Sequence, residues 1–232
     1  MLLVNKPQAL LFDLDGTLAH TLPQLSIAMR QAAKELGVPE PDDATMASFI
    51  GNGAKMLIAR TLAGKHDVTL EDIPAERLAA GLALFRKYYM AGLHENVSLY
   101  PGVLEGLQAF AERGIKMAVV TNKPHIFAEP LVKFLGIDKY MGAVLGSEVI
   151  PERKPDPAPL YHVLKQIAVA PQHAVMVGDS VNDVKAGHNA AMPTVAFTFG
   201  YDGGYDVRSS DPDYIFDHFS DLTKLITSLP EA

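Results

Sequence analysis

Two aspartates lie two residues apart in the segment LLFDLDGTLAHT (residues 10–21), directly after a run of apolar residues. Asp13 and Asp15 therefore follow what the apolar run predicts to be a buried strand. A carboxylate removed from water costs several kcal/mol unless it is paired, so two of them at one strand end imply a nearby cation. Gly16 and Thr17 then turn the chain, and an ordinary Asp-Gly turn is the alternative interpretation.

Two further apolar runs end in polar residues that suit the same chemistry. KMAVVTNKP contains Thr121 and Asn122, and AVMVGDSVND contains Asp179 and Asp183. Each run is apolar on consecutive residues, as in a parallel strand that is covered on both faces. Ligands of open parallel sheets bind beyond the carboxyl ends of the strands. We therefore expect these side chains to meet those of the first segment.

A lysine in a proline-rich segment, ERKPDPAPL, adds a positive charge to this set. Three aspartates from distant parts of the chain would repel one another unless a cation joined them. A site of oxygen ligands with open positions suits Mg²⁺, which retains waters and binds phosphate oxygens. Lys154 then supplies the charge that a phosphate needs in a protein with a net charge of −7. Taken singly, Thr121 and Asp179 are equally typical of helix N-caps, and Lys154 and Asp183 of solvated surface positions.

Helical patterns separate the apolar runs. GVLEGLQAFAERG has apolar residues at helical spacing and ends at Gly114. HIFAEPLVKFLG and APLYHVLKQIA follow the same pattern, with a kink or break expected at Pro130. TVAFTF predicts a further strand. Alternating strands and helices predict the α/β class, with a Rossmann-like, doubly wound parallel sheet.

Residues 18–93 interrupt this alternation with segments that are helical throughout. We expect them to form an all-helical cap inserted into a catalytic core of residues 1–17 and 94–232. Four apolar residues of the last segment form one stripe, which is typical of a packed core rather than of a ligand site: Leu78, Leu82, Phe85 and Tyr89.

Composition excludes several classes of function. The 232 residues contain no cysteine, so disulfides and thiolate metal sites are ruled out. The negative net charge and the absence of long basic runs argue against nucleic acid and anionic membranes as partners. No apolar stretch approaches the roughly 18 residues of a membrane span, and the start, MLLVNKPQ, is too short for a signal-peptide core. We expect a soluble, cytoplasmic monomer or homodimer.

Taken together and in order, DLDGTL, TNKP, KPDP and GDSVND resemble the four motifs of the haloacid dehalogenase superfamily of phosphotransferases. The resemblance implies a Rossmann-like core with a helical cap inserted after the first motif. FIGNGAKMLIARTL and FTFGYDGGYD further resemble segments of phosphoglycolate phosphatases. The implied function is a Mg²⁺-dependent phosphomonoester hydrolase that acts on a small phosphorylated metabolite, 2-phosphoglycolate.

The resemblance also implies roles for individual acidic residues. Asp13 is the expected nucleophile, and a carboxylate can attack phosphorus to form an aspartyl phosphate. Asp15 is the expected general acid and base. The expected metal ligands are the side chains of Asp13 and Asp179 and the backbone carbonyl of Asp15. Asp183, one helical turn after Asp179, is expected to brace the ion through water or Lys154.

The expected phosphate-binding residues are Gly16, Thr121, Asn122 and Lys154, with Thr121 and Lys154 also counted among the catalytic residues. The family has an acidic residue where this chain has His20, at the start of the link to the cap. We expect that change to affect closure or specificity rather than the chemical step. The alternatives are a sugar phosphomutase or a pyrophosphatase of the same superfamily and, in a different class, a non-catalytic binding module.

Overall fold

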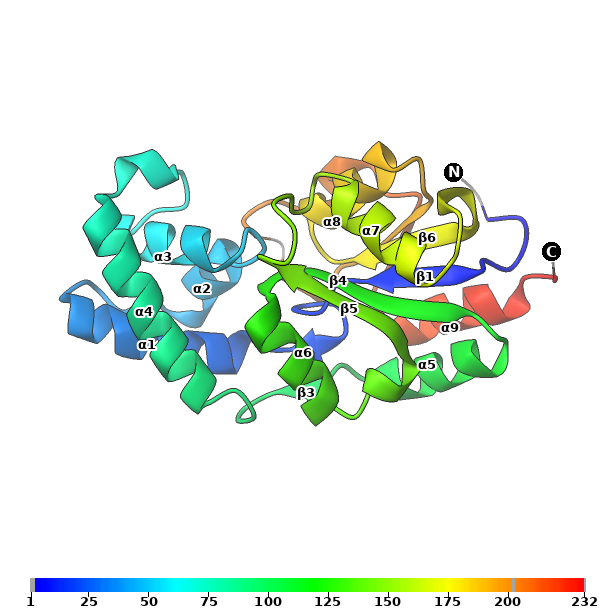
Figure 1. Ribbon diagram of the computed structural model, residues 1–232, viewed down its shortest axis with the longest axis horizontal. Coiled ribbons are helices and arrows are strands. Elements are labelled where there is room, and N and C mark those ends of the chain that lie inside the picture. Colours follow the sequence, from blue (N-terminus) through cyan, green and yellow to red (C-terminus); the bar gives the residue numbers. More distant parts are fainter. Residues whose placement is uncertain (1–2, 202, 232) are drawn as a thin grey trace.

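A six-stranded, all-parallel sheet forms the centre of the protein in the computed structural model, which describes residues 3–201 and 203–231 (Figure 1). The strands follow the order β5-β4-β1-β6-β7-β8. In chain order, their bounds are β1 Ala9–Phe12, β4 Lys116–Pro124, β5 Met141–Ser147, β6 Ala174–Gly178, β7 Thr194–Phe197 and β8 Tyr214–Phe216. The central position of β1 places the residues that follow it between those of β4 and β6.

Helices cover both faces of this sheet, as its apolar runs require. Leu10 and Phe12 pack into the cluster on one face, and Ala9 and Leu11 into the cluster on the other. The first face carries α5 Val103–Glu112, α6 His125–Phe134 and α9 Phe219–Ser228. The second face carries α7 Ala158–Gln166 and α8 Val181–Asn189. The predicted α/β fold with a doubly wound parallel sheet is confirmed.

Two details differ from the sequence-based expectation. Helix α6 continues through Pro130, so the expected break does not occur. Its neighbours Phe127 and Leu131 are fully buried, and their packing maintains the helix despite the lost backbone hydrogen bond. Strands β5 and β8 were not predicted, because β5 contains two glycines and β8 has only three residues.

Four helices lie beyond the carboxyl ends of the central strands, at the left of Figure 1. Two short strands, β2 Ala19–His20 and β3 Ser98–Leu99, pair in antiparallel fashion where the chain leaves the sheet region and returns to it. Between them lie α1 Leu22–Leu36, α2 Asp43–Phe49, α3 Ala54–Ala63 and α4 Ala75–Ala91. We call these four helices the cap and the sheet with its five helices the core.

Four 3₁₀ turns complete the secondary structure of the described residues: η1 Leu70–Asp72, η2 Asp138–Tyr140, η3 Pro171–His173 and η4 Val207–Ser210. In this part of the chain the longest helix is α4, with 17 residues. Its sequence includes two arginines, a lysine and a glutamate. No helix of residues 3–201 and 203–231 has both the length and the apolar character needed to cross a membrane.

Candidate active site

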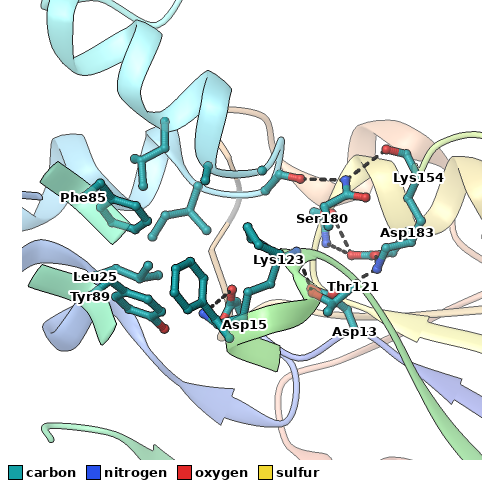
Figure 2. A pocket seen from close by; sticks show the side chains of 18 residues that line it. Asp13, Asp15, Leu25, Phe85, Tyr89, Thr121, Lys123, Lys154, Ser180 and Asp183 are labelled. Atoms are coloured by element: carbon teal, nitrogen blue, oxygen red, sulfur yellow. Dashed lines mark hydrogen bonds and ion pairs between the residues drawn. The ribbon is translucent and has the colours of Figure 1, made fainter. Parts of the chain in front are cut away.

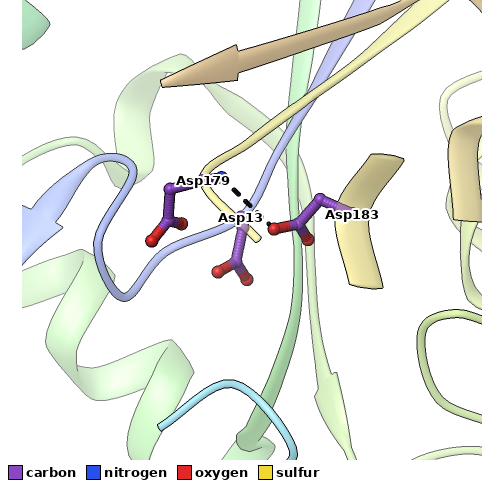
Figure 3. A group of neighbouring side chains, drawn as sticks. All are labelled: Asp13, Asp179 and Asp183. Carbon is purple, nitrogen blue, oxygen red and sulfur yellow. Dashed lines mark hydrogen bonds between the residues drawn. The ribbon is translucent and has the colours of Figure 1, made fainter. Parts of the chain in front are cut away.

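Three aspartates converge at the carboxyl ends of β1 and β6. Asp13 follows β1, Asp179 follows β6, and Asp183 lies in the first turn of α8 (Figure 3). One carboxylate oxygen from each of them lies within 4.8 Å of the others. The parallel register that pairs Phe12 with Val177 brings residues more than 160 positions apart in the sequence to one point. The expected meeting of these side chains at the sheet edge is observed.

Lys154 joins two of these carboxylates. Its Nζ donates to Asp13 Oδ1 at 2.9 Å, to Asp183 Oδ1 at 2.6 Å and to the carbonyl of Val120 at 2.5 Å. All three ammonium donors are therefore used, and the side chain is 2% exposed. Burial lowers the pKa of Lys154, but Asp13 and Asp183 raise it by more, so this lysine stays charged. It is a fixed cation at the base of the site.

The carboxylates carry more negative charge than Lys154 balances. Burial raises the pKa of Asp13 to about 6, with repulsion from Asp183 adding to the effect and Lys154 opposing it. Burial, and then repulsion from Asp13, raise the pKa of Asp179 well above its usual range. Both raised pKa values mean that the cost of burying these ionised carboxylates is not fully compensated by nearby positive charge or hydrogen bonds. A divalent cation between the carboxylates would supply it.

Side chains and backbone of distant segments hold Asp179 in place. Thr17 Oγ1 donates to its Oδ1 and the backbone N–H of Tyr201 to its Oδ2, both at 2.6 Å. Gly16 and Gly200 pack against the same carboxylate, since a Cβ at either position would lie within 2.2 Å of Asp179 Oδ2. Neither Thr17 nor Tyr201 was predicted to act here, and Tyr201 gives no local signal because its partner lies 22 residues away.

Asp183 has a structural role besides its contact with Lys154. Its Oδ2 accepts hydrogen bonds from the backbone N–H of Ser180 at 3.0 Å and from its Oγ at 2.7 Å. Ser180 is the N-cap of α8, so this reciprocal pairing fixes the start of the helix. Asp183 thereby sets the position of the loop that carries Asp179.

The carboxylate of Asp15 contacts a lysine that sequence reasoning missed. Lys123 Nζ lies 2.9 Å from Asp15 Oδ1 and 3.1 Å from Oδ2, and 4.6 Å from the centre of the Tyr89 ring. The lysine side chain is only 3% exposed. A signal was present in the sequence, because Lys123 directly follows the predicted site residues Thr121 and Asn122 at the end of the strand segment KMAVVTNKP.

The remaining predicted residues surround this group. Asn122 Nδ2 donates to the carbonyls of Gly51 in the cap and of Lys154, both at 3.0 Å, and so joins the cap to the core. Thr121 Oγ1 accepts a hydrogen bond from the backbone N–H of Lys123 at 3.2 Å. The N–H of Gly16 donates to the carbonyl of Ala19 at 3.0 Å and is therefore used within the turn.

A small cavity lies between these polar residues and the cap. The space open to the centres of water molecules is about 50 Å³, enough for a few waters. Polar side chains line one end, and aromatic side chains line the other (Figure 2). The apolar wall consists of Leu25, Ile50, Leu57, Phe85, Tyr89 and Phe127. Phe85 and Tyr89 are buried core residues, as expected, and they also form part of this wall.

The carboxylate cluster has the chemistry and nearly the size of a magnesium site. Mg²⁺ prefers oxygen ligands at about 2.1 Å, so opposite ligands of an octahedral site lie about 4.2 Å apart. The three carboxylate oxygens lie within 4.8 Å of one another, a limit slightly above this distance. Asp13 and Asp179 would hold such an ion, with Asp183 beside them.

Comparisons with known proteins agree with this geometry. The family model for haloacid dehalogenase-like hydrolases matches residues 10–197. A phosphoglycolate phosphatase of Psychrobacter arcticus is 41% identical over 93% of this chain and 94% of its own. A phosphoglycolate phosphatase of Haemophilus influenzae is 37% identical, over 93% of this chain and 96% of its own.

Solved structures show the same relationship. A crystal structure described as a predicted phosphoglycolate phosphatase from Haemophilus somnus has a TM-score of 0.85 and 35% identity, covering 94% of this chain and 97% of its own. A second one, from Lactobacillus delbrueckii, has a TM-score of 0.88 at 24% identity and shows the likeness of fold alone. The chain therefore belongs to the family of haloacid dehalogenase-like hydrolases, as an enzyme of the phosphatase class.

Proposed function

We propose that this protein is a Mg²⁺-dependent phosphomonoester hydrolase that converts 2-phosphoglycolate to glycolate and inorganic phosphate. The observation that carries the proposal is that Asp13, which lines a small cavity beneath the cap, contacts Lys154 and has a carboxylate oxygen within 4.8 Å of one from Asp179. This is the arrangement expected of a site that attacks a phosphoryl group and balances its charge. The names of the relatives support the choice of substrate.

Asp13 is the proposed nucleophile. One of its oxygens attacks phosphorus, the bond from phosphorus to the ester oxygen breaks, and an aspartyl phosphate forms. Water then attacks the same phosphorus, which releases phosphate and restores the carboxylate. Bound Mg²⁺ would supply charge neutralisation for the carboxylate and the phosphoryl oxygens. Lys154, fixed by Asp183 and Val120, keeps Asp13 oriented for the attack.

Asp15 is the proposed proton carrier. It would donate a proton to the leaving ester oxygen in the first step and accept one from water in the second. Its carboxylate lines the cavity beside that of Asp13, which is where such a group must lie. Lys123 holds it there through two contacts, at 2.9 and 3.1 Å. General acid–base help of this kind is typically worth about 10²–10⁴-fold in rate.

The small cavity supports a small substrate. The space open to the centres of water molecules is about 50 Å³, which favours a two-carbon phosphoester over a hexose phosphate or a nucleotide. The cap loop at Gly51 is hydrogen-bonded to Asn122 of the core, so the cap is held against the core beside the cavity in this conformation. Closure of this kind protects the aspartyl phosphate until the second step.

A screen for phosphate release tests the proposal directly. The purified enzyme with Mg²⁺ is given equal concentrations of 2-phosphoglycolate, hexose phosphates, nucleoside monophosphates and pyrophosphate, and phosphate is measured over time. We expect the highest kcat/KM for 2-phosphoglycolate. A higher value for any other member of the panel contradicts the substrate assignment, and transfer of phosphate between sugar hydroxyls would identify a mutase instead.

A further inference from the structure

We propose that Lys123 binds a carboxylate in the leaving group of the substrate and thereby selects phosphoesters of small acidic alcohols. The proposal deepens the function proposed above and rests on it for the position of the phosphoryl group. Lys123 lies in the strand segment that also carries Thr121, yet its side chain contacts Asp15 rather than the Asp13–Lys154 pair. Figure 2 shows Lys123 and Asp15 between that pair and the aromatic wall of the cap.

Lys123 and Lys154 are the cationic side chains among the described residues that line the cavity. They differ in how many of their ammonium N–H groups remain free to bind a ligand. Lys154 donates to Asp13, Asp183 and Val120, so its three N–H groups are used. Lys123 directs its hydrogen bonds to the one carboxylate of Asp15 and otherwise lies over the Tyr89 ring. An ammonium group has three N–H donors, so Lys123 can donate a hydrogen bond to a second carboxylate.

Burial makes this lysine an effective anion-binding group. Its side chain is 3% exposed, and the neighbouring wall includes Phe85, Tyr89 and Phe127. Charges attract more strongly in such surroundings than in water. Within that wall, the hydroxyl of Tyr89 is a further possible donor to an anion, but it carries no charge. A substrate with an acidic leaving group would therefore place its carboxylate at Lys123.

The dimensions of 2-phosphoglycolate fit this placement. One methylene group separates its ester oxygen from the carboxyl carbon, so the ester and carboxylate oxygens lie about 3 Å apart. Asp15 is the proposed contact of the ester oxygen, and Lys123 Nζ lies 2.9 Å from Asp15 Oδ1. The ammonium group of Lys123 is therefore hydrogen-bonded to the carboxylate of Asp15, which is the proposed contact of the ester oxygen. The same substrate can reach Asp15 and Lys123 at once.

A lysine that bridges two carboxylates already exists in this site. Lys154 contacts Asp13 at 2.9 Å and Asp183 at 2.6 Å with the same nitrogen atom. Lys123, placed between Asp15 and the substrate carboxylate, would repeat that arrangement in the same cavity. Lys154 would then balance charge at the phosphate end through Asp13, and Lys123 would bind the acidic end.

A pair of substrates separates this role from a purely structural one. Lys123→Met is compared with wild type on 2-phosphoglycolate and on 2-hydroxyethyl phosphate, which has a hydroxymethyl group in place of the carboxylate. Any effect that the variant has on Asp15 or on the fold reduces both rates equally. We expect kcat/KM to fall about 100-fold more for 2-phosphoglycolate than for the neutral ester, because a buried charge-assisted bond is lost. Equal losses would overturn the proposal.

Lys55→Met is the matched control. Lys55 is an exposed lysine in the first turn of α3, close to Gly53 of the cavity but outside it. Its replacement removes the same charge from the same region. We expect the ratio of the two kcat/KM values to stay within about twofold of the wild-type ratio. A loss of selectivity as large as that of Lys123→Met would show a general field effect and would also overturn the proposal.

A binding measurement on the wild-type enzyme tests the proposal even if Lys123→Met does not fold or if 2-phosphoglycolate is not the substrate. Binding of 3-phosphonopropionate and of propylphosphonate to the wild-type enzyme with Mg²⁺ is measured by calorimetry. Tighter binding of the carboxylate compound by about 100-fold supports the proposal even if the phosphate-release screen fails. Equal binding of the two compounds contradicts it, whatever the result of that screen.

Discussion

Buried lysines and aspartates in this site occur as paired charges. Lys154 lies against Asp13 and Asp183, and Lys123 lies against Asp15, with both lysine side chains at most 3% exposed. A buried charge without a partner would cost several kcal/mol, so each cation is fixed by the carboxylates that surround it. Asp179 differs, because its partners are a threonine hydroxyl and a backbone N–H rather than a cation. It is the carboxylate best placed to receive a metal charge.

Asp13→Asn tests the nucleophile. The amide cannot form an acyl phosphate under turnover conditions, so we expect phosphate release to fall by at least about 10⁴-fold. The fold should survive, because Lys154 keeps Asp183 and Val120 as partners and one unfavourable buried charge is removed. Steady-state assays with thermal unfolding as the control measure both effects. Activity within tenfold of wild type in a folded variant would refute the assignment.

At the level of secondary-structure elements, a single tyrosine links the cap to the loop that carries Asp179. The hydroxyl of Tyr201 accepts hydrogen bonds from the N–H groups of Thr21 and Leu22, both at 2.8 Å. These N–H groups belong to the start of α1, which has no side-chain cap of its own. The backbone N–H of Tyr201 meanwhile donates to Asp179. One residue of the loop after β7 therefore serves as the N-terminal cap of a cap-domain helix and as a support for the site.

Further contacts join the cap to the core. The carbonyl of Gly51 accepts hydrogen bonds from Asn122 and from Asn182, at 3.0 and 3.2 Å. Arg86 of α4 contacts both carboxylate oxygens of Glu148, just after β5. These links involve segments other than the paired strands β2 and β3, through which the chain leaves the sheet region and returns to it. A cap that opens must break them, while the Tyr201 contacts beside the strands can persist.

Tyr201→Phe tests the helix-capping contact. Removing the hydroxyl leaves the buried N–H of Thr21 and the part-buried N–H of Leu22 without their acceptor, and we expect the free energy of unfolding to fall by about 2 kcal/mol. Chemical denaturation of the wild type and the variant measures this difference. Tyr205→Phe makes the same chemical change at a side chain that is 55% exposed, so it should alter stability by less than about 0.5 kcal/mol. Equal stabilities for Tyr201→Phe and wild type would disprove the capping role.

At the scale of the whole molecule, an acidic protein acts on an acidic substrate. The net charge of −7 opposes the approach of a phosphoester, and the site itself contains four aspartates. Two buried lysines alone do not balance these aspartates and a phosphate dianion. A divalent cation would restore local balance, because burial raises the pKa values of Asp13 and Asp179 and so disfavours their ionised forms. The site and the ion are therefore expected to stabilise each other.

Mg²⁺ should stabilise the folded protein as well as activate it. A ligand at 100 times its Kd adds about 2.7 kcal/mol, which corresponds to about 5–10 °C in Tm for a chain of this size. We expect that rise on adding Mg²⁺, and loss of activity in excess chelator that Mg²⁺ reverses. Sodium chloride at equal ionic strength is the control, and Asp179→Asn should abolish the shift. Full activity in excess chelator would remove the metal from the mechanism.

The sequence by itself determined the parallel sheet and the set of acidic residues at its carboxyl edge. Runs such as ALLF and AVMVG are apolar on consecutive residues, a local signal that needs no knowledge of the rest of the chain. The motif order then placed Asp13, Asp179 and Lys154 together. Strand β5 escaped prediction because its glycines weaken that local signal.

Only the tertiary structure decided which side chains pair and what closes the cavity. Lys123 meets Asp15 across 108 residues, and Tyr201 meets the start of α1 across 180. Such contacts depend on strand register and on the docking of the cap, which no local pattern encodes. The periodic pattern of apolar residues specifies which faces of the strands and helices are buried. The partner of a buried charged side chain is fixed only by the distances between these elements once they have packed.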